Sequence, residues 1–225
     1  HNLSINQKIS DGYIQGMDYN IKNYYYQINS IKNGIHTLIN AGYSEKEFGA
    51  FSFYTPVYPN QFEKTKTTFA SLQIKTEGNI SFRNNLYWRK HNDNFILFRE
   101  NPSLYQNFHK TNVFGTDMNI IQKTKYGSNV VGMEIRNDNI ISNVLGEELQ
   151  NPIQIDSNNF YFKGANRTMI NLFAEKNIKL DNINISTGFM TNINSDYGNS
   201  YFPGIDLSYK IKNNISFFIS YNKSM

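Results

Sequence analysis

The sequence contains no cysteine among its 225 residues, which excludes disulfide bonds and cysteine-ligated metal sites. Charged residues are also scarce, at 18%. The 22 lysines and arginines are mixed with 18 aspartates and glutamates, as in the run Glu45-Lys46-Glu47, so the net charge of +4 forms no basic stripe. We therefore expect no nucleic-acid partner.

Long apolar runs are missing as well. The longest are short stretches such as Phe95-Ile96-Leu97-Phe98. A membrane-spanning helix needs roughly 18 or more consecutive apolar residues, so a helical membrane protein is excluded. A membrane β-barrel is not excluded, because each of its strands is apolar on only one face.

The residues that are plentiful favour extended structure. Aromatic residues reach 15%, with 16 Tyr and 17 Phe, and such side chains suit a pleated surface. Apolar and polar residues alternate with a period of two, which places successive side chains on opposite faces of a strand. The clearest segments are 35–43, 131–136, 170–175, 183–192 and 205–211. The chain is predicted to be all-β.

Short and long connections alternate along the chain. Tight turns are predicted at 32–34, 76–79, 125–128, 177–182 and 212–214, and long polar connections at 45–65, 94–108, 142–163 and 194–201. This alternation is typical of an antiparallel up-and-down transmembrane β-barrel, with tight turns on one rim and long loops on the other. We expect about eleven strands near ten residues long, with polar faces toward a wet lumen and apolar faces toward lipid. Aromatic girdles are expected at strand ends, at Tyr24–Tyr26, Trp88, Phe202 and Tyr221.

A soluble β-sandwich or jelly roll is the alternative reading of the same alternation. It would bury the apolar faces against a second sheet. A spanning sheet must instead close, because lipid offers no water to unpaired backbone groups. The segments near 2–13 and 215–221 would be bare edges. Residues 1–225 are therefore expected to be a partial β-barrel domain, with the remaining strands and a plug domain absent. The polar start at His1, without a signal peptide, and the end at Lys223-Ser224-Met225 agree with this expectation.

Several motifs carry a resemblance to a known family. They are Phe48-Gly49-Ala50-Phe51-Ser52-Phe53-Tyr54, the stretch from Tyr58 to Thr67, Tyr87-Trp88-Arg89-Lys90-His91-Asn92-Asp93, His109-Lys110-Thr111-Asn112-Val113, Gly132-Met133-Glu134-Ile135-Arg136, Ser142-Asn143-Val144-Leu145-Gly146, Asn166-Arg167-Thr168 and Tyr201-Phe202-Pro203-Gly204-Ile205-Asp206. The chain resembles, from about residue 10 to its end, the middle of the barrel of TonB-dependent receptors from Bacteroidetes commonly assigned to cobalamin uptake.

The resemblance implies a function and a location. It implies a barrel of roughly 22 strands with a plug in its lumen, set in outer-membrane lipid of a Gram-negative bacterium. The implied activity is energised uptake of a bulky nutrient, cobalamin first and an iron-siderophore next. It implies the TonB energising complex as a partner, acting through the absent plug, and allows a surface lipoprotein as another. A passive porin-like channel is the rival. No cofactor and no enzymatic activity are expected.

Substrate contacts are expected in the long loops, where aromatic and amide side chains can cover a large polar ligand. The candidates are Tyr54, Tyr58, Asn60 and Gln61 in one loop and Tyr105, Gln106 and Asn107 in the next. Packing between loops at the rim is the competing explanation of the same residues.

Other polar groups make weaker patterns. His91, Asp93 and His109 are too few and too loosely spaced for a metal motif. The calcium-like runs 137–139 and 156–158 lack the longer ligand loop with its closing Glu. Glu147 and Glu148 form a pair of carboxylates, but adjacent residues in an exposed loop are ordinarily solvated. No nucleophile, base and orienting acid form a catalytic set. We therefore expect no metal site and no catalytic residue.

Overall fold

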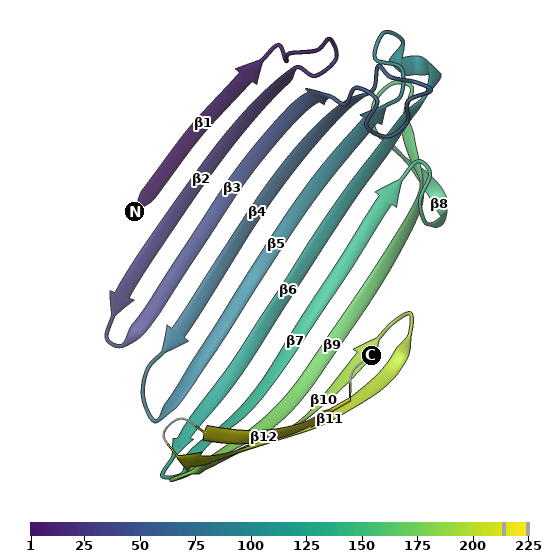
Figure 1. Ribbon diagram of the computed structural model, residues 1–225. Coiled ribbons are helices and arrows are strands. Elements are labelled where there is room, and N and C mark those ends of the chain that lie inside the picture. The colour runs from purple at the N-terminus through teal and green to yellow at the C-terminus, as the bar shows by residue number, and fades with distance from the viewer. Residues whose placement is uncertain (213–214, 224–225) are drawn as a thin grey trace.

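The computed structural model describes residues 1–212 and 215–223, which form one antiparallel sheet (Figure 1). The elements are β1 (Asn2–Ser10), β2 (Tyr19–Lys32), β3 (Ile35–Gly49), β4 (Phe62–Thr76), β5 (Ile80–Ile96), the short 3-10 helix η1 (Pro102–Leu104), β6 (Gln106–Thr124), β7 (Gly127–Ser142), β8 (Glu147–Gln154), β9 (Phe160–Leu180), β10 (Ile183–Asn194), β11 (Gly198–Lys212) and β12 (Ile215–Asn222). No helix in this part of the chain is long and apolar enough to cross a membrane.

Each strand of the wall pairs with its neighbours along the chain. The order is β1-β2-β3-β4-β5-β6-β7-β9-β10-β11-β12, and β8 pairs only with β9. The wall thus has eleven strands, which confirms the predicted up-and-down topology and strand number. Among the described residues β1 and β12 each pair on one side only, so the sheet is open. A single sheet also excludes the sandwich alternative.

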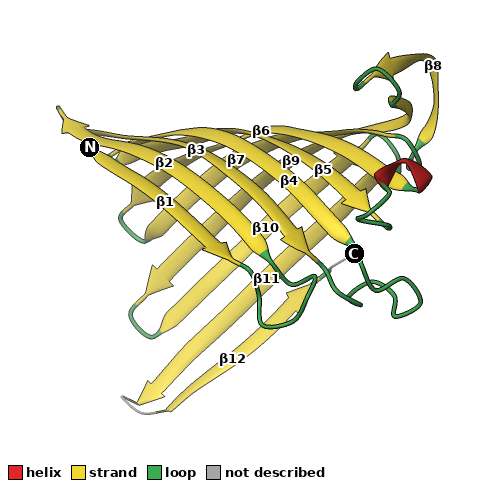
Figure 2. Ribbon diagram, turned by 90° about the horizontal axis from the view of Figure 1, so that it is seen from above, coloured by secondary structure: helices red, strands yellow, loops and turns green. Residues whose placement is uncertain are grey.

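The sheet is strongly curved. Seen from above, it bends from β1 through β6 to β12, and β8 lies outside the curve (Figure 2). Strand register separates the two faces, because directly paired residues point to the same side. One unbroken row of partners is almost entirely apolar: Ile28, Ile39, Leu72, Leu86, Thr116, Ile135, Ile170 and Ile193. The next row is mostly polar: Asn29, Leu38, Gln73, Asn85, Asp117, Glu134, Asn171 and Asn192.

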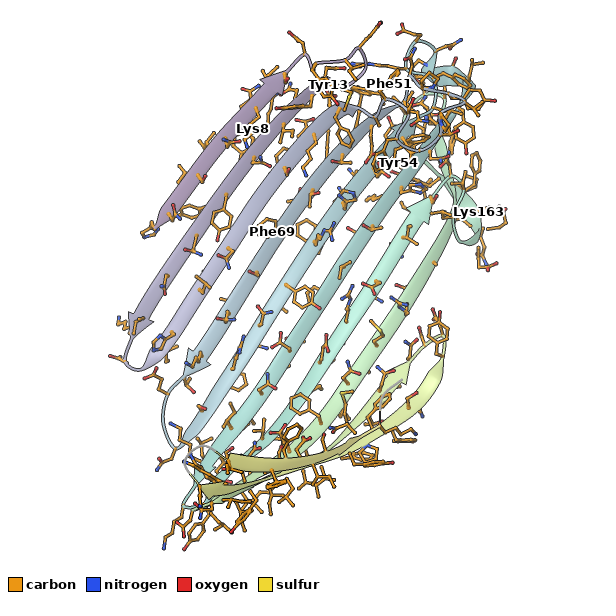
Figure 3. All side chains as sticks on the ribbon, viewed as in Figure 1. Lys8, Tyr13, Phe51, Tyr54, Phe69 and Lys163 are labelled. Carbon is orange, nitrogen blue, oxygen red and sulfur yellow. The ribbon has the colours of Figure 1, made fainter. Side chains whose placement is uncertain are left out.

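The polar rows belong to the concave face. Phe69 lies four residues before Gln73 on β4, so the two side chains point to the same face. Phe69 lies on the concave side of the wall (Figure 3). The apolar rows therefore cover the convex face. This arrangement agrees with a polar lumen inside and lipid outside.

Connection lengths differ between the two ends of the strands. Residues 33–34, 77–79, 125–126 and 181–182 make tight turns at one end, here called the short-turn rim. Residues 11–18, 50–61, 97–105 and 143–159 make long connections at the other end, the long-loop rim. The predicted turn at 212–214 falls mainly on 213–214, outside the described residues. The segregation of loop lengths is otherwise as predicted.

One predicted long connection is wrong. Residues 194–201 were expected to form a loop, but β10 continues to Asn194 and β11 begins at Gly198. A tight turn is feasible here because the Asn194 side chain accepts a hydrogen bond from the backbone N–H of Asp196 at 3.0 Å. Gly198 supplies the positive φ of +74°.

The strands are also longer than the predicted ten residues. β2 to β7 contain 14 to 19 residues and β9 contains 21. About ten residues suffice to cross a bilayer, so these strands continue beyond the lipid. The observed loops are correspondingly shorter than the predicted ones. The turn predicted at 177–182 contains only residues 181–182.

This extra length corrects the expected position of the aromatic girdle. Tyr26, Trp88 and Phe114 belong to one outward row, but that row crosses the middle of the strands. Tyr25 and Phe202 were expected in the girdle and instead belong to concave rows, as partners of Gly42 and Met190. An interface girdle marks the lipid boundary, and strands that extend past the lipid leave that boundary away from their ends.

Candidate functional site

The few fully buried side chains gather near the long-loop rim. Gln61 is 0% exposed, and Ala50, Phe62 and Ile96 are also buried there. Both polar atoms of the Gln61 side-chain amide are hydrogen-bonded within its own loop. Its Oε1 accepts a hydrogen bond from Tyr54 N, and its Nε2 donates to Thr55 O, both at 3.0 Å. Residues 50–61 therefore form a packed loop around Gln61, with few ways to rearrange.

An ion pair ties three separate loops together. The Arg99 guanidinium, in the 97–105 connection, donates two hydrogen bonds to the Asp18 carboxylate at 2.5 and 2.7 Å. The same guanidinium lies 4.2 Å from the centre of the Phe62 ring. Arg99 N also donates to Asn60 O at 3.0 Å. Bidentate contacts fix geometry better than single ones, so loops 11–18, 50–61 and 97–105 are held in one arrangement.

Two close backbone contacts strengthen this tie. Gly49 N donates to Asp18 O at 2.8 Å, and Phe51 N donates to Gly16 O at 3.3 Å. A Cβ at position 49 would lie 2.2 Å from Gly16 O, so only glycine allows loop 11–18 to approach this closely. The three loops and the contacts between them are called the rim clamp below.

Tyr54 turns from the rim clamp toward the concave face. Its hydroxyl donates to Glu63 Oε2 at 2.5 Å, and its ring packs edge-on against Phe95 at 4.9 Å between centres. Glu63 and Phe95 are direct partners in a concave row, and Tyr54 lies in front of the wall near its upper end (Figure 3). Partial burial, followed by the Glu63 carboxylate, raises the pKa of the Tyr54 hydroxyl well above its usual value. Tyr54 therefore stays a hydrogen-bond donor at physiological pH.

The loop around Tyr54 presents a large apolar and aromatic surface. Phe53 is 77% exposed and Tyr54 54%, and Val57 and Tyr58 are exposed as well. Phe53 packs edge-on against Tyr54 at 4.9 Å, and Tyr58 packs against Phe98 at 5.0 Å. These rings are held in place yet open to solvent. Such a surface suits a bulky ligand with apolar and ring-shaped parts. We call Phe53, Tyr54, Val57 and Tyr58 the aromatic platform.

The structure separates the predicted contact residues of the first loop. Tyr54 and Tyr58 are exposed on the platform, and Asn60 is exposed while its carbonyl holds Arg99. Gln61 is buried and holds the loop from within. Sequence reasoning missed Phe53, Asp18 and Arg99. Asp18 and Arg99 are 81 residues apart, and no local pattern announces their pairing.

The predicted contact residues of the second loop line a hollow that is separate from the aromatic platform. Tyr105, Gln106 and Asn107 meet Asn143, Asn158 and Asn159 of the 143–159 connection around a space of about 530 Å³. Asn143 holds the two connections together, because its Nδ2 donates to Gln106 O at 2.8 Å. The predicted contacts thus divide between the aromatic platform and this amide-lined hollow.

The histidines and the acidic runs are engaged with other groups. His91 Nδ1 lies 2.8 Å from Thr67 Oγ1, and His109 Nδ1 lies 2.8 Å from Ser142 Oγ. Within residues 1–212 and 215–223 no three His, Cys, Asp or Glu side chains are grouped as metal ligands.

The two calcium-like runs have structural roles. The Asp138 carboxylate accepts from Arg136 at 2.9 Å and from Arg167 at 3.1 Å. The Asp156 carboxylate accepts from the backbone N–H groups of Asn158 and Asn159 and closes a turn. These oxygen atoms serve ion pairs and a turn.

The rim clamp predicts a defined response to acid. The hydrogen bonds from Arg99 lower the pKa of the Asp18 carboxyl below its usual 3.8. A lowered folded-state pKa means that the pair contributes stability above the unfolded pKa and loses it as pH falls through the folded value. Hydrogen exchange of residues 11–18, corrected for the intrinsic rate, should therefore be unchanged from pH 7 to 5 and accelerate only below about 4. Loss of protection already between pH 6 and 5 would contradict this assignment.

Comparison with known proteins identifies the wall. Residues 6–225 match the family model described as TonB dependent receptor-like, beta-barrel. Among solved structures, the siderophore receptor PirA from Pseudomonas aeruginosa is similar with a TM-score of 0.65 and 12% identity over 86% of this chain and 31% of that one. Two mutants of the ferric enterobactin receptor PfeA from the same organism are similar with TM-scores of 0.64 and 0.65 and 14% identity. The match to the first mutant covers 96% of this chain and 35% of that receptor. The match to the second covers 90% of this chain and 33% of that receptor.

At such identities the structural likeness shows the fold alone, and the chain spans about a third of the length of these receptors. No curated protein matches the chain. The family match covers nearly the whole sequence. The chain therefore belongs to the TonB-dependent receptor-like β-barrel family, whose members lie in the Gram-negative outer membrane.

Proposed function

We propose that this chain is part of the wall of a receptor that takes up a bulky nutrient with energy delivered through TonB. The nutrient binds at the long-loop rim, on the outside of the cell, and passes inward when a plug domain moves. The plug and the strands that close the barrel lie outside residues 1–225 in this proposal. The observation that supports cargo binding is the aromatic platform, which is exposed, braced by the rim clamp and joined to the concave face through Tyr54.

Cobalamin is the first candidate for the cargo and an iron-siderophore the second. The cobalamin candidate rests on sequence motifs that resemble those of Bacteroidetes receptors. The same resemblance allows a surface lipoprotein as a further partner. The siderophore candidate rests on the solved structures, whose titles name siderophore and ferric enterobactin receptors. Both cargoes are large and carry ring-shaped apolar parts beside polar groups. The platform rings can pack against the apolar parts, and the exposed side chain of Asn60 in the same loop can bind the polar groups. Binding and gated passage require no catalytic step.

A passive porin-like channel is the rival proposal. A passive pore conducts through an open mouth, whereas here loop 50–61 packs against the concave face through Tyr54, Glu63 and Phe95. This packing favours a receptor whose mouth binds its cargo. A receptor also predicts that uptake stops when the proton gradient is dissipated, while a passive channel keeps conducting.

Replacement of Tyr54 tests the platform. We expect Tyr54→Ala to weaken binding of the cargo about tenfold, because exposed, preorganised aromatic rings are the usual anchors of an interface. Tyr54→Phe keeps the ring and loses only the hydrogen bond to Glu63. Its affinity for the cargo should therefore lie between those of the wild-type protein and Tyr54→Ala. Binding is measured by fluorescence quenching with cyanocobalamin and with a ferric siderophore, on the full-length receptor in detergent micelles.

Tyr126 offers a matched control, because it is an exposed tyrosine on the short-turn rim. Tyr126→Ala should leave binding unchanged. Equal binding by the Tyr54→Ala and wild-type proteins would reject the platform as the contact surface. Binding of neither ligand by the wild-type protein, together with uptake that survives an uncoupler, would favour the passive channel.

A further inference from the structure

The amide-lined hollow between η1 and the 143–159 connection has the size of a ligand site. Its volume of about 530 Å³ falls within the roughly 300–1,000 Å³ of small-molecule pockets. It is distinct from the aromatic platform, since none of the four platform residues contributes to its lining. It is called the amide hollow below.

The lining of the amide hollow is neutral throughout. Its polar side chains are five amides and two hydroxyls, namely Gln106, Asn107, Asn143, Asn158, Asn159, Tyr105 and Ser103. Pro102, Leu104 and Val144 add apolar surface. Each amide offers two donors and a carbonyl acceptor within one small group. A lining of this kind does not select a phosphate or a metal ion, and it matches a ligand that carries several neutral groups able to donate and accept.

Part of this network holds the walls of the hollow. Asn143 Oδ1 accepts from Phe108 N and its Nδ2 donates to Gln106 O, both at 2.8 Å. Gln106 Oε1 in turn accepts from Asn94 Nδ2 at 3.2 Å. These bonds join the start of β6 to the end of β7 before any ligand arrives. The hollow is therefore preformed, which reduces the ordering cost of binding.

Other groups of the lining retain unused hydrogen-bonding capacity. Asn107 Oδ1 is buried without a partner among the described residues. A buried acceptor without a partner is unfavourable, and a ligand donor that reached it would remove that cost. Tyr105 is exposed, and the backbone N–H of Asn158 donates to the Asp156 carboxylate. Neither the Tyr105 hydroxyl nor the side-chain amide of Asn158 is bonded to another side chain in the part of the chain that the structure describes. The hollow thus combines rigid walls with free polar groups and one accessible aromatic ring.

We propose that the amide hollow binds a neutral sugar, one or two rings of a glycan. Sugar hydroxyls both donate and accept, as the amides do, and the apolar C–H face of a sugar ring packs against an aromatic ring such as Tyr105. The glycan has two sources: the head of an outer-leaflet glycolipid or a soluble oligosaccharide. The 143–159 connection carries β8 on the convex side of the wall, which faces lipid (Figure 2). This site goes beyond nutrient uptake and does not depend on the identity of the cargo.

The test compares two double variants of the full-length receptor in detergent micelles, because residues 1–225 alone form an open sheet. Tyr105→Leu with Asn158→Leu removes the free ring and the free amide but leaves the Asn143 bonds that hold the walls. Tyr13→Leu with Asn151→Leu is the matched control, since Tyr13 is 85% exposed and Asn151 is an exposed β8 residue, both outside the hollow. Saturation-transfer NMR with neutral trisaccharides of glucose, galactose and mannose probes soluble glycans. Native mass spectrometry with added lipopolysaccharide probes the lipid source.

The proposal predicts that at least one probe binds the wild-type protein and the control, and that the Tyr105/Asn158 variant binds it at least tenfold more weakly. Binding of trisaccharides identifies a soluble glycan, and binding of lipopolysaccharide alone identifies a membrane glycolipid. Absence of binding by either probe, or equal binding by the two double variants, overturns the proposal. Should the double variant fail to migrate as a folded barrel, Asn158→Leu alone provides the comparison. Binding of cyanocobalamin and of a ferric siderophore is measured on the same variants, because Tyr105 is also a candidate cargo contact. Loss of glycan binding with cargo binding retained supports a separate glycan site, whereas parallel loss of both shows that the hollow belongs to the cargo site and overturns the proposal.

Discussion

Replacing Gly127 by alanine is expected to produce the largest loss of stability of any single methyl addition in the tight turns. Gly127 opens β7 with φ of +136°, where L-residues are strained by about 1–3 kcal/mol. Its added Cβ would lie 2.0 Å from Asn177 O and 2.8 Å from Asn177 C. These are backbone atoms of β9, and Gly127 pairs directly with Ile178. The methyl group must therefore push the two strands apart, at a further cost of roughly 1–3 kcal/mol.

Gly34 provides the control for the strain alone. It also has a positive φ, +74°, in a tight turn at the same rim, but nothing lies within 4 Å of its added Cβ. We expect Gly34→Ala to lower the free energy of unfolding by about 1 kcal/mol. Urea titration of the full-length receptor in detergent micelles, followed by the mobility of folded and unfolded forms on gels, measures both variants. Equal shifts of the two midpoints would show that the predicted contact with Asn177 is absent.

Arg99→Met is expected to loosen the long-loop rim while the wall remains folded. The substitution keeps the backbone bond to Asn60 O and much of the apolar stem, but removes both hydrogen bonds to Asp18 and the contact with Phe62. Because the pair is about one-third exposed, solvent screens it, and we assign about 1–2 kcal/mol to the ion pair and ring contact together. That range corresponds to roughly a 5–30-fold rise in loop opening. Chymotrypsin cleavage at the exposed Tyr13 should accelerate by this factor.

The same variant should weaken cargo binding, since the aromatic platform loses the brace that orders it before binding. Lys64→Met is the control. Lys64 pairs with Glu47 at 3.2 Å and lies 5.7 Å from the same Phe62 ring, but this pair is more exposed. Its replacement should change cleavage and binding by less than about 0.5 kcal/mol. Unchanged cleavage in Arg99→Met would show that the backbone contacts of Gly16 and Gly49 hold the loop without the ion pair.

The sequence alone determined the fold class, the two faces of the wall and the separation of the rims. Alternation such as that of Ile183, Ile185 and Thr187 is local, and a strand has only two sides, so a period of two identifies them without knowledge of the neighbours. Tight turns are equally local, because residues such as Asn33 and Gly34 can adopt the positive φ that the turn requires. Motifs spread along most of the chain carried a resemblance to TonB-dependent receptors, and the family match over residues 6–225 confirms that family.

Some strand boundaries were missed for a physical reason. A strand that leaves the lipid no longer needs an apolar face, so its sequence resembles that of a polar loop. β3 continues through Glu45, Lys46 and Glu47 to Gly49, inside the predicted connection 45–65. Only the pairing with β2 and β4 shows that these residues remain in a strand. The same effect moved the aromatic girdle away from the strand ends.

Tertiary structure alone decided which loop residues can meet a ligand. Gln61 and Tyr54 both looked like ligand contacts in sequence, yet Gln61 is enclosed by its loop and Tyr54 is turned toward the lumen. Three contacts join strands and loops that are far apart in the chain. They are the Asp18–Arg99 ion pair, the packing of the Phe69 ring over Gly42, and the hydrogen bond from Asn143 to Gln106. Local patterns report the faces and turns that a segment adopts by itself. Contacts between distant loops depend on register and curvature of the whole wall, which no local pattern encodes.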